Sequence, residues 1–366
     1  MEPIRAVGVD PGTLSFSIFG IEGDKVILDE DIPTKVIAED PKKVINIIAS
    51  AEPDIIAGPS GYGVPVKAPS ELTQLEEFTT ILLKKDDKSL PVLEGVKKMI
   101  EIAISYNLPM YLIPSVILLP TVPKYRKYNK IDMGTADKLC VTVLGVYDQS
   151  RRLEIEYKDV SFILAEIGGA YTSIIGVKGG VIVDGIGGTQ GPMGFINMGR
   201  LDGEVAYILG EFKKALLFEG GVISIVGKPD ITVDEFFSKV DKDSTYYEAY
   251  IALIEDIARF INAMRVSVRN PREILISGRL SGYKKLLSDL EDFVGDIAPI
   301  VRISGFKASK AKHPAQGAAI VADGLGGGPR KDLIDHMRIR EASGTVLDYV
   351  LLSGWMKRVK EVIGIE

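Results

Sequence analysis

The sequence predicts an α/β protein built from two similar halves, and two observations carry this prediction. The pattern at 7–21 (VGVDPGTLSFSIFGI) returns at 163–177 (ILAEIGGAYTSIIGV): an apolar strand, an acid, a turn with glycine, and a second apolar strand. VILD at 26–29 then corresponds to VIVD at 181–184, at an offset of 155 rather than 156 residues. Segments with helical spacing of apolar residues follow in both halves. We infer two copies of one unit, each opening with a β-meander.

The remainder of the first half alternates between helical and extended patterns. Pro41–Ala51 and Ser89–Tyr106 have helical spacing, whereas 54–58 (DIIAG) is typical of a buried strand and Met110–Leu119 is predicted to be extended. Ile131–Tyr147 is predicted to be an amphipathic helix, because its apolar residues recur three and four positions apart. These residues are Ala136, Leu139, Cys140, Val143, Leu144 and Tyr147.

The second half repeats this alternation. Apolar spacing predicts helices at Val205–Leu216 and Tyr247–Val268, and 273–278 (EILISG) is predicted to be a buried strand that ends in glycine. His313–Leu325 is predicted to be a helix with a face of small residues, ended by a triple glycine. The tail at 329–366 is expected to add one or two helices.

Composition excludes several classes of function. Lys and Arg number 44 against 50 Asp and Glu, so the formal charge of −6 gives no basic field for nucleic acid or anionic membranes. One cysteine and two histidines nearly exclude a thiolate–imidazole zinc site. The lack of a disulfide pair and of an apolar leader favours a cytoplasmic location. The longest apolar stretch, Tyr111–Pro120, is too short to span a bilayer.

An acid ends the first strand of each half and is followed by a turn that contains glycine. These turns are Asp10-Pro11-Gly12-Thr13 and Glu166-Ile167-Gly168-Gly169. Such a turn can direct backbone N–H groups at phosphate, while the acid holds a hydrated Mg²⁺ ion. Either turn alone could be an ordinary hairpin turn. The matched pair favours a clamp that binds the phosphates of a nucleotide from both sides.

The two turns resemble the first and second phosphate motifs of the superfamily that contains acetate and sugar kinases, heat-shock 70-kilodalton chaperones and actin. The other three motifs of that superfamily have counterparts in the expected order. Ile131–Tyr147 resembles the first connecting helix, 274–282 (ILISGRLSG) the adenosine motif, and 313–324 (HPAQGAAIVADG) the second connecting helix. The resemblance covers nearly the whole chain. It implies two ribonuclease-H-like (actin-like ATPase) domains, each with a mixed five-stranded sheet flanked by helices, and a cleft between them.

The resemblance also implies domain limits, ligands and roles. The first domain would cover 1–160, joined by helices from 326–366, and the second would cover 161–325. ATP and Mg²⁺ would bind in the cleft, with Asp10 and Glu166 as catalytic acids that hold the metal. Further residues are expected to contact the nucleotide: Gly12, Thr13, Gly168 and Gly169 at the phosphates, and Ser277, Gly278 and Arg279 at the adenosine.

Two loops resemble the acceptor loops of acyl kinases, and the layout looks most like butyrate kinases, including archaeal proteins described as predicted butyrate kinases. The loops are 54–67 (DIIAGPSGYGVPVK) and 188–204 (GTQGPMGFINMGRLDGE). The resemblance implies a small-molecule carboxylate acceptor near Ser60, Gly61 and Gly191. Acyl kinases carry an arginine in each loop. Here Pro59 and Ser60 stand in the first loop and Asn197 and Met198 in the second, with Arg200 as the nearest substitute.

A second resemblance keeps an alcohol acceptor open. Residues 134–138 (GTADK) are similar to the GxDR segment of type III pantothenate kinases, which implies that Asp137 is a catalytic base and that Lys138 contacts the acceptor or the phosphoryl group. An alcohol is helped by a base, whereas a carboxylate is already an anion. Asp137 is equally typical of an ordinary first helical turn. Asp132 is a rival, either as a helix cap or as the reactive carboxylate.

A third alternative is a nucleotide-binding switch that hydrolyses ATP and signals to a partner, as the chaperones of the superfamily do. The missing loop arginines favour it, and the lack of an added partner domain disfavours it. Many members of the superfamily form dimers, so a homodimer is expected by analogy alone.

Overall fold

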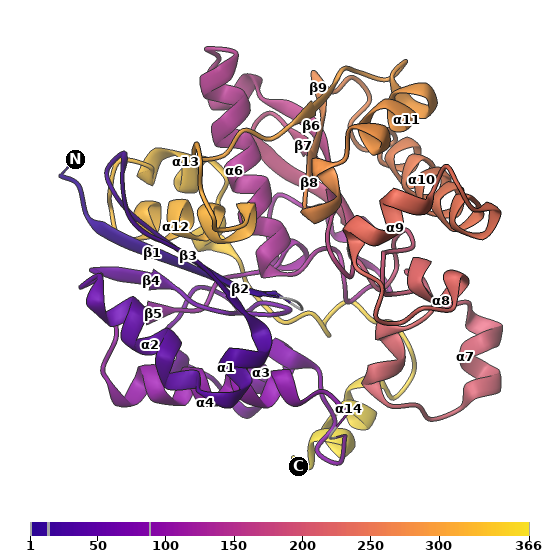
Figure 1. Ribbon diagram of the computed structural model, residues 1–366. Helices are drawn as coiled ribbons and strands as arrows, with labels where there is room; N and C mark the ends of the chain where they lie inside the picture. The colour runs from indigo at the N-terminus through magenta and orange to yellow at the C-terminus, as the bar shows by residue number, and fades with distance from the viewer. Residues whose placement is uncertain (1, 13–14, 88, 366) are drawn as a thin grey trace.

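The chain forms two five-stranded mixed sheets flanked by helices, which confirms the predicted fold class (Figure 1). The computed structural model describes residues 2–12, 15–87 and 89–365. The first sheet has the order β3-β2-β1-β4-β5 and the second the order β10-β9-β6-β7-β8. The strands of the first sheet are β1 (Arg5–Pro11), β2 (Ser15–Glu22), β3 (Lys25–Pro33), β4 (Ile55–Ala57) and β5 (Met110–Tyr111). Those of the second are β6 (Ser161–Ile167), β7 (Thr172–Lys178), β8 (Val181–Ile186), β9 (Glu273–Ser277) and β10 (Ile300–Arg302).

The predicted internal repeat is present in the strand pairing. In both sheets the first three strands are antiparallel and the next two are parallel to the first. The middle strand of each meander breaks its register at an equivalent glycine, Gly20 in β2 and Gly176 in β7. The two halves therefore share one topology down to the position of a bulge.

The match of VILD with VIVD is wrong by one residue. Asp29 lies opposite Phe19, and the residue equivalent to Phe19 is Ile175, which lies opposite Gly185 rather than Asp184. The spatial offset of the third strand is therefore 156 residues, as in the other two. A slip of one residue moves a side chain to the other face of a sheet.

Asp29 and Asp184 accordingly bind different neighbours. The Asp29 carboxylate accepts hydrogen bonds from the Ser309 hydroxyl and the Ala311 N–H, both at 2.8 Å. Asp184 accepts a hydrogen bond from the Ser267 hydroxyl and one from the N–H of the next residue. Neither aspartate reaches the predicted phosphate turns through these bonds.

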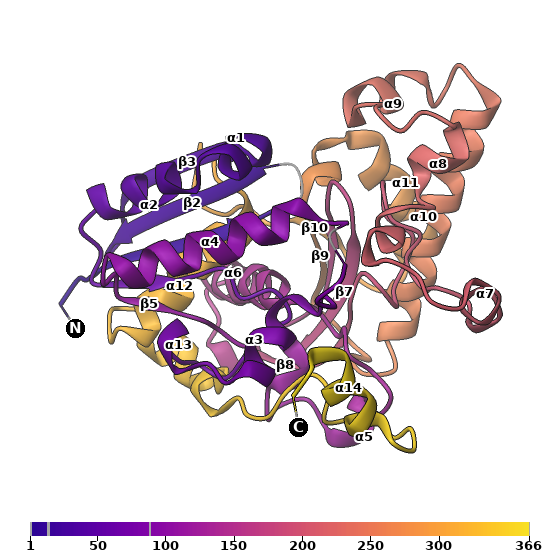
Figure 2. The same ribbon diagram turned by 90° about the horizontal axis from the view of Figure 1, so that it is seen from below.

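Helices form three layers around the two sheets (Figures 1 and 2). The outer face of the first sheet packs on α2 (Pro41–Ser50) and α4 (Pro91–Ser105), and that of the second packs on α10 (Ser244–Met264) and α11 (Lys284–Val294). The middle layer holds α6 (Ala136–Arg152) and α12 (His313–Leu325). The other helices are α1 (Thr34–Glu39), α3 (Gln74–Ile81), α5 (Lys124–Lys127), α7 (Gly203–Leu209), α8 (Val222–Val226), α9 (Val233–Lys239), α13 (Lys331–His336) and α14 (Trp355–Ile363).

Small residues let the middle layer pack closely. A Cβ on Gly317 of α12 would lie 1.9 Å from the Cys140 carbonyl oxygen of α6. A Cβ on Gly8 of β1 would lie 2.2 Å from the Ala319 amide nitrogen of α12. The predicted small-residue helix therefore exists with its expected bounds, and glycine is required on both sides of it.

The predicted helix at Val205–Leu216 is wrong in extent. The helix α7 ends at Leu209, and a 3₁₀ turn, η4 (Lys214–Phe218), follows. The apolar residues that predicted the helix do not face a core, because Ile208 is 81% exposed and Val205 is 46% exposed. Apolar spacing without a tertiary partner was therefore misleading here.

Candidate functional site

In each sheet the acid at the end of the first strand stands in a row of polar residues. Asp10 lies in register with Ser17 of β2. Glu166 lies in register with Ser173 of β7 and with Ser277 of β9. Residues in register on neighbouring strands share one face of the sheet. Both acids are buried, at 5% and 4% exposure, so each carboxylate needs a partner within the protein.

The partner of Asp10 is Lys312, which the sequence analysis did not single out. The Lys312 ammonium lies 2.8 Å from Asp10 Oδ2 and donates a hydrogen bond of 2.7 Å to the Ser15 carbonyl. Lys312 is the residue immediately before α12. A signal existed in the sequence, because Lys312 directly precedes the motif predicted as the second connecting helix.

The partner of Glu166 is Lys138, which the sequence did predict as a site residue. The Lys138 ammonium lies 2.8 Å from Glu166 Oε2 and 2.7 Å from Asp137 Oδ2. Asp137 also accepts a hydrogen bond from the Thr135 hydroxyl. Asp137 and Lys138 stand in the first turn of α6, so this helix delivers both groups to the acid of the second sheet.

The charges of this cluster shift one another's pKa values. Burial raises the pKa of Glu166, and Lys138 offsets part of that rise. Burial also favours a raised pKa for Asp137, but the Lys138 ammonium and the hydrogen bond from Thr135 contribute to a net lowering of the pKa of Asp137. Lys312 adds to that lowering, and Asp10 adds to the rise of Glu166. The acids and lysines of both halves therefore interact as one electrostatic cluster.

The two glycine turns leave little room for a side chain. The Gly12 N–H donates a hydrogen bond of 3.0 Å to the Asp10 carbonyl. A Cβ on Gly12 would lie 2.2 Å from the Lys312 ammonium. The Gly168 N–H donates to the Tyr171 carbonyl, and a Cβ there would lie 2.8 Å from the same oxygen. Gly169 follows in a half-buried bend, and Thr13 lies outside the described residues.

A half-buried histidine joins the predicted adenosine motif to the start of α12. The Ser277 hydroxyl lies 2.8 Å from Nδ1 of His313, the first residue of α12. Burial and the nearby Arg302 lower the pKa of His313 to about 4. Gly278 has a φ of +91°, and a Cβ there would lie 2.3 Å from the Ile167 carbonyl oxygen. Arg279 is exposed.

The first predicted acceptor loop lies against α6. The Ser60 hydroxyl donates to the Gly58 carbonyl and accepts from the Ile113 N–H, both at 2.9 Å. The Gly61 carbonyl accepts a hydrogen bond of 2.9 Å from the Ala136 N–H, the first of α6. This bond joins the loop to the first turn of α6, which carries Asp137 and Lys138. The Ser60 hydroxyl itself bonds only within the loop and to the segment that follows β5.

The second predicted acceptor loop does not bring Arg200 to the cluster. The Arg200 guanidinium pairs with Asp256 of α10, at 2.8 and 3.0 Å, and half of its side chain is exposed. The backbone N–H of Arg200 donates a hydrogen bond to the Gly191 carbonyl, and this bond closes the loop. Arg200 therefore stabilises this loop against α10, and the structure gives it no contact with Asp10 or Glu166.

A different cation stands near the acceptor loops. Lys214 of η4 lies over the Tyr62 ring, with its ammonium 4.8 Å from the ring centroid. The ammonium also donates to the carbonyls of Ile81 and Leu82, at the end of α3. Burial lowers the pKa of Lys214 to about 8, against a partial offset from Asp132. Lys214 therefore links a segment of the second half to the first acceptor loop.

Both carboxylate oxygens of Asp132 accept hydrogen bonds from neighbouring residues, so its role is structural. Its Oδ2 accepts hydrogen bonds from the N–H and the hydroxyl of Thr189, at 3.0 and 2.9 Å. Its Oδ1 accepts from the Gly134 N–H. A Cβ on Gly187 would lie 1.8 Å from Oδ1. Asp132 thus binds the glycine-rich loop after β8 to the segment before α6.

The residues around the acids fit a hydrated Mg²⁺ ion with a nucleotide. Within the described ranges, three buried hydroxyls at the starts of β2 and β7 have no hydrogen-bond partner: Ser15, Thr172 and Ser173. The donor set is made of hard oxygens, which Mg²⁺ prefers. No group of three His, Cys, Asp or Glu side chains suited to a metal occurs in the described residues. Asp10 and Glu166 supply two carboxylates, and Mg²⁺ usually binds through one or two carboxylates and substrate phosphates.

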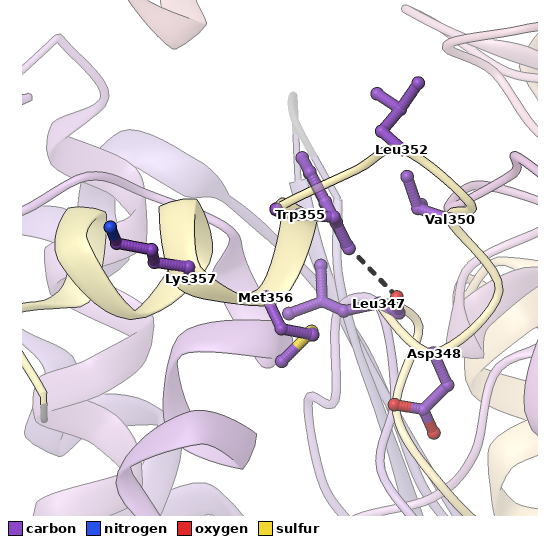
Figure 3. Close-up of a pocket in the computed structure, with 8 residues that line it drawn as sticks. Leu347, Asp348, Val350, Leu352, Trp355, Met356 and Lys357 are labelled. Carbon is purple, nitrogen blue, oxygen red and sulfur yellow. Dashed lines mark hydrogen bonds between the residues drawn. The ribbon is translucent and has the colours of Figure 1, made fainter.

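A surface hollow lies away from this charged cluster. A depression of about 480 Å³ is lined by the segment before α14 and by its first turn (Figure 3). The indole N–H of Trp355 donates to the Leu347 carbonyl at 3.1 Å and closes one side of it. None of its lining residues belongs to the charged cluster. In the part of the chain that is described, no helix is long and apolar enough to cross a membrane.

Comparison with known proteins places the chain in a family and a fold. The profile of a family described as "Protein of unknown function (DUF1464)" matches residues 8–352. The chain belongs to the DUF1464 family. This DUF1464 protein is 25% identical over 222 residues to "Probable butyrate kinase 2" of Caldanaerobacter subterraneus subsp. tengcongensis. That match covers 55% of this chain and 59% of the relative, so it spans less than two thirds of the relative's length.

Solved structures share the fold of the DUF1464 chain. A propionate kinase from Francisella tularensis matches with a TM-score of 0.62 at 12% identity, over 87% of this chain and 99% of that chain. An acetate kinase from Entamoeba histolytica matches with a TM-score of 0.60 at 12% identity, over 80% of this chain and 86% of that chain. At these identities the comparison shows the fold, which is that of acetate and propionate kinases.

Proposed function

We propose that this DUF1464 protein is an ATP- and Mg²⁺-dependent small-molecule kinase that phosphorylates a carboxylate, with short butyrate-like acids as the first candidates. One observation carries the proposal. Asp10 and Glu166, at equivalent positions of the two halves, share one electrostatic cluster with Lys312 and Lys138. The kinase fold and the partial butyrate kinase match support it.

The proposed roles follow from the position of each group. Asp10 and Glu166 would hold hydrated Mg²⁺, which when bound with ATP neutralises charge on the transferring phosphoryl group. Backbone amides near Gly12 and Gly168 would bind its β- and γ-phosphates. The adenosine would lie along Ser277, Gly278 and Arg279. We propose residues 1–160 with 326–366, and 161–325, as the two domains that close on the nucleotide and exclude water.

The lysines favour a carboxylate acceptor over an alcohol. A carboxylate needs cations that neutralise its charge as the phosphoryl group arrives, and Lys138 and Lys214 are placed beside the acceptor loops. An alcohol needs a base, but the pKa of Asp137 is lowered by Lys138, which makes it a weaker base. The lysines would thus take the place of the loop arginines of acyl kinases. Lys214 reaches the loop that carries Tyr62, and Arg200 does not.

A hydroxyl-directed kinase is the second candidate. The hydrogen bond between the Ala136 N–H and the Gly61 carbonyl places Asp137 next to the first acceptor loop, where a base would have to stand. Replacing Asp137 separates the two candidates. Asp137→Asn should abolish transfer to an alcohol, with a loss of about 10²-fold or more, but should leave transfer to a carboxylate largely intact.

The test measures release of ADP from Mg²⁺–ATP with a panel of C2–C6 carboxylic acids and a matched panel of alcohols. Hydroxylamine traps an acyl phosphate as a hydroxamate, so it identifies the carboxylate product directly. ADP release that requires a carboxylate and yields hydroxamate would support the proposal. Release that requires an alcohol would overturn the acceptor class. Release without any acceptor would instead indicate a nucleotide switch, and no ADP release under any condition would overturn the kinase.

A further inference from the structure

Lys312 stands at the junction of the two halves, and its backbone is fixed there by the first sheet. Its N–H donates a hydrogen bond of 3.2 Å to the Ser17 hydroxyl of β2. The three residues before it are held by Asp29 of β3, through the Ser309 hydroxyl and the N–H groups of Lys310 and Ala311. The start of α12 therefore has a defined position relative to the turn after β1.

The Lys312 ammonium occupies the glycine turn itself. It lies 2.8 Å from Asp10 Oδ2 and 2.7 Å from the Ser15 carbonyl oxygen. It fills the space in which a Gly12 side chain would stand, because a Cβ there would be 2.2 Å away. The adjacent Ser15 hydroxyl is buried and, among the described residues, has no hydrogen-bond partner. The cation therefore contacts the backbone of Ser15, whose buried hydroxyl has no partner among the described residues.

Mg²⁺ held by Asp10 would compete with Lys312 for this carboxylate, whose Oδ2 lies 2.8 Å from the ammonium. A divalent cation and an ammonium that share one carboxylate repel each other, so binding of the metal favours movement of Lys312. The lysine stem is flexible and its three donors rotate freely. If the carboxylate were to hold the metal, a phosphate bound at the same turn would offer the ammonium a new anionic partner. The charge of Lys312 also acts on Asp137 in the same cluster, since it helps to lower the pKa of that carboxylate.

From this geometry we infer that Lys312 is a ligand of the terminal phosphate of the bound nucleotide, and that it exchanges its ion pair with Asp10 for that phosphate when Mg²⁺–ATP binds. The inference rests on the proposed function. It assigns to α12 a direct part in closure, because the residue that precedes this helix would bind the phosphate. It also explains why the cation is lysine, whose compact charge can move between two anions, rather than a rigid arginine fork.

The test compares the affinities of Mg²⁺–ATP and Mg²⁺–ADP by calorimetry, without any acceptor. In Lys312→Met, binding of Mg²⁺–ATP should weaken about 10- to 100-fold, as for the loss of one hydrogen bond to a charged group. Binding of Mg²⁺–ADP should weaken no more than about threefold. Lys310→Met is the matched control, because it removes the same charge from the same loop while its exposed ammonium lies 4.0 Å from Glu30. It should bind both nucleotides as the unaltered protein does.

The outcomes separate this inference from the proposed function. Equal weakening of both nucleotides, or weakening of neither, would overturn the role of Lys312 and leave the kinase standing. No binding of either nucleotide to the unaltered protein would overturn both. Should Lys312→Met not fold, because Asp10 is left buried and unpaired, Asp10→Asn removes that charge. The single variant Asp10→Asn is then compared with the double variant that also carries Lys312→Met. Only a weaker binding of Mg²⁺–ATP, but not of Mg²⁺–ADP, in the double variant would support a phosphate contact.

Discussion

The ammonium of Lys138 lies 2.8 Å from the carboxylate of Glu166, and the two residues come from different halves of the chain. Lys138 stands in the first turn of α6, whereas Glu166 ends the first strand of the second sheet. Both side chains are nearly buried, at 12% and 5% exposure. The ion pair between Asp10 and Lys312 is its counterpart, with the acid in the first sheet and the lysine before α12. Each connecting helix thus brings a lysine to one acid.

Lys138→Met should destabilise the protein strongly. The change leaves the carboxylates of Asp137 and Glu166 without their shared cation, and breaking a buried ion pair on one side costs about 3–5 kcal/mol. Urea denaturation measures the free energy of unfolding. Lys158→Met is the control, because Lys158 pairs with Glu156 in the solvent, and it should have no measurable effect. A loss below about 1 kcal/mol, the range of surface pairs, would show that the Lys138 pair is not structurally important.

Asp10→Ala should reduce acceptor-dependent turnover at least about 10²-fold, as expected for the loss of one electrostatic group that stabilises the transition state. The reason is that Asp10 is the proposed Mg²⁺ holder of the first half. Steady-state kinetics with saturating Mg²⁺–ATP measures the effect, and Glu156→Gln at an exposed site is the control. A loss of less than threefold, with ATP binding intact, would contradict the assignment of Asp10.

Gly317→Ala should destabilise the contact between the two connecting helices. Its new Cβ would lie 1.9 Å from the Cys140 carbonyl oxygen, so the helices would have to move apart. Overpacking of a tight core costs about 1–3 kcal/mol or more. Gly203→Ala is the matched control, because no described atom lies within 4 Å of a Cβ at this helical position. Thermal unfolding should show a lower midpoint for Gly317→Ala alone; equal midpoints would argue against close packing.

His313 should make stability depend on pH below neutrality. Burial lowers its pKa from 6.5 to about 4, so between these values the unfolded chain binds a proton that the folded chain does not. Stability therefore falls as the pH decreases from 6.5 to 4, by up to about 3 kcal/mol at 1.36 kcal/mol per pKa unit. In His313→Gln this contribution should disappear from urea titrations across that range. The control His336→Gln retains His313 and should show the same pH dependence of stability as the unaltered protein. An unchanged dependence of the free energy of unfolding on pH in His313→Gln would refute the assignment.

Local patterns in the sequence were sufficient to predict much of this fold. The repeat of an apolar strand, an acid and a glycine turn predicted two β-meanders, and the structure contains both. The small-residue helix at His313–Leu325 was predicted with the bounds that the structure gives. These features depend on periodicity and on residues that the local backbone demands, and such signals lie within short stretches of chain.

Two predictions failed where local pattern and tertiary context disagree. Apolar spacing predicted a longer helix from Val205, but α7 ends at Leu209 and its apolar residues are exposed. The alignment of the third strands was shifted by one residue, because it matched the similar sequences at 26–29 and 181–184, whereas the strand pairing matches residues 156 positions apart. Register is set by cross-strand contacts, which no single strand contains.

The α/β class, the internal repeat, and the positions of Asp10, Glu166 and their glycine turns could be predicted from the amino-acid sequence, because each of these depends on neighbouring residues. The partners of the two acids could not, because they depend on long-range packing. Lys312 is 302 positions from Asp10 along the chain, and their contact at 2.8 Å exists because α12 packs across the first sheet. Charge pairing acts through space over a few ångströms, so long-range packing selects which cation each buried carboxylate meets.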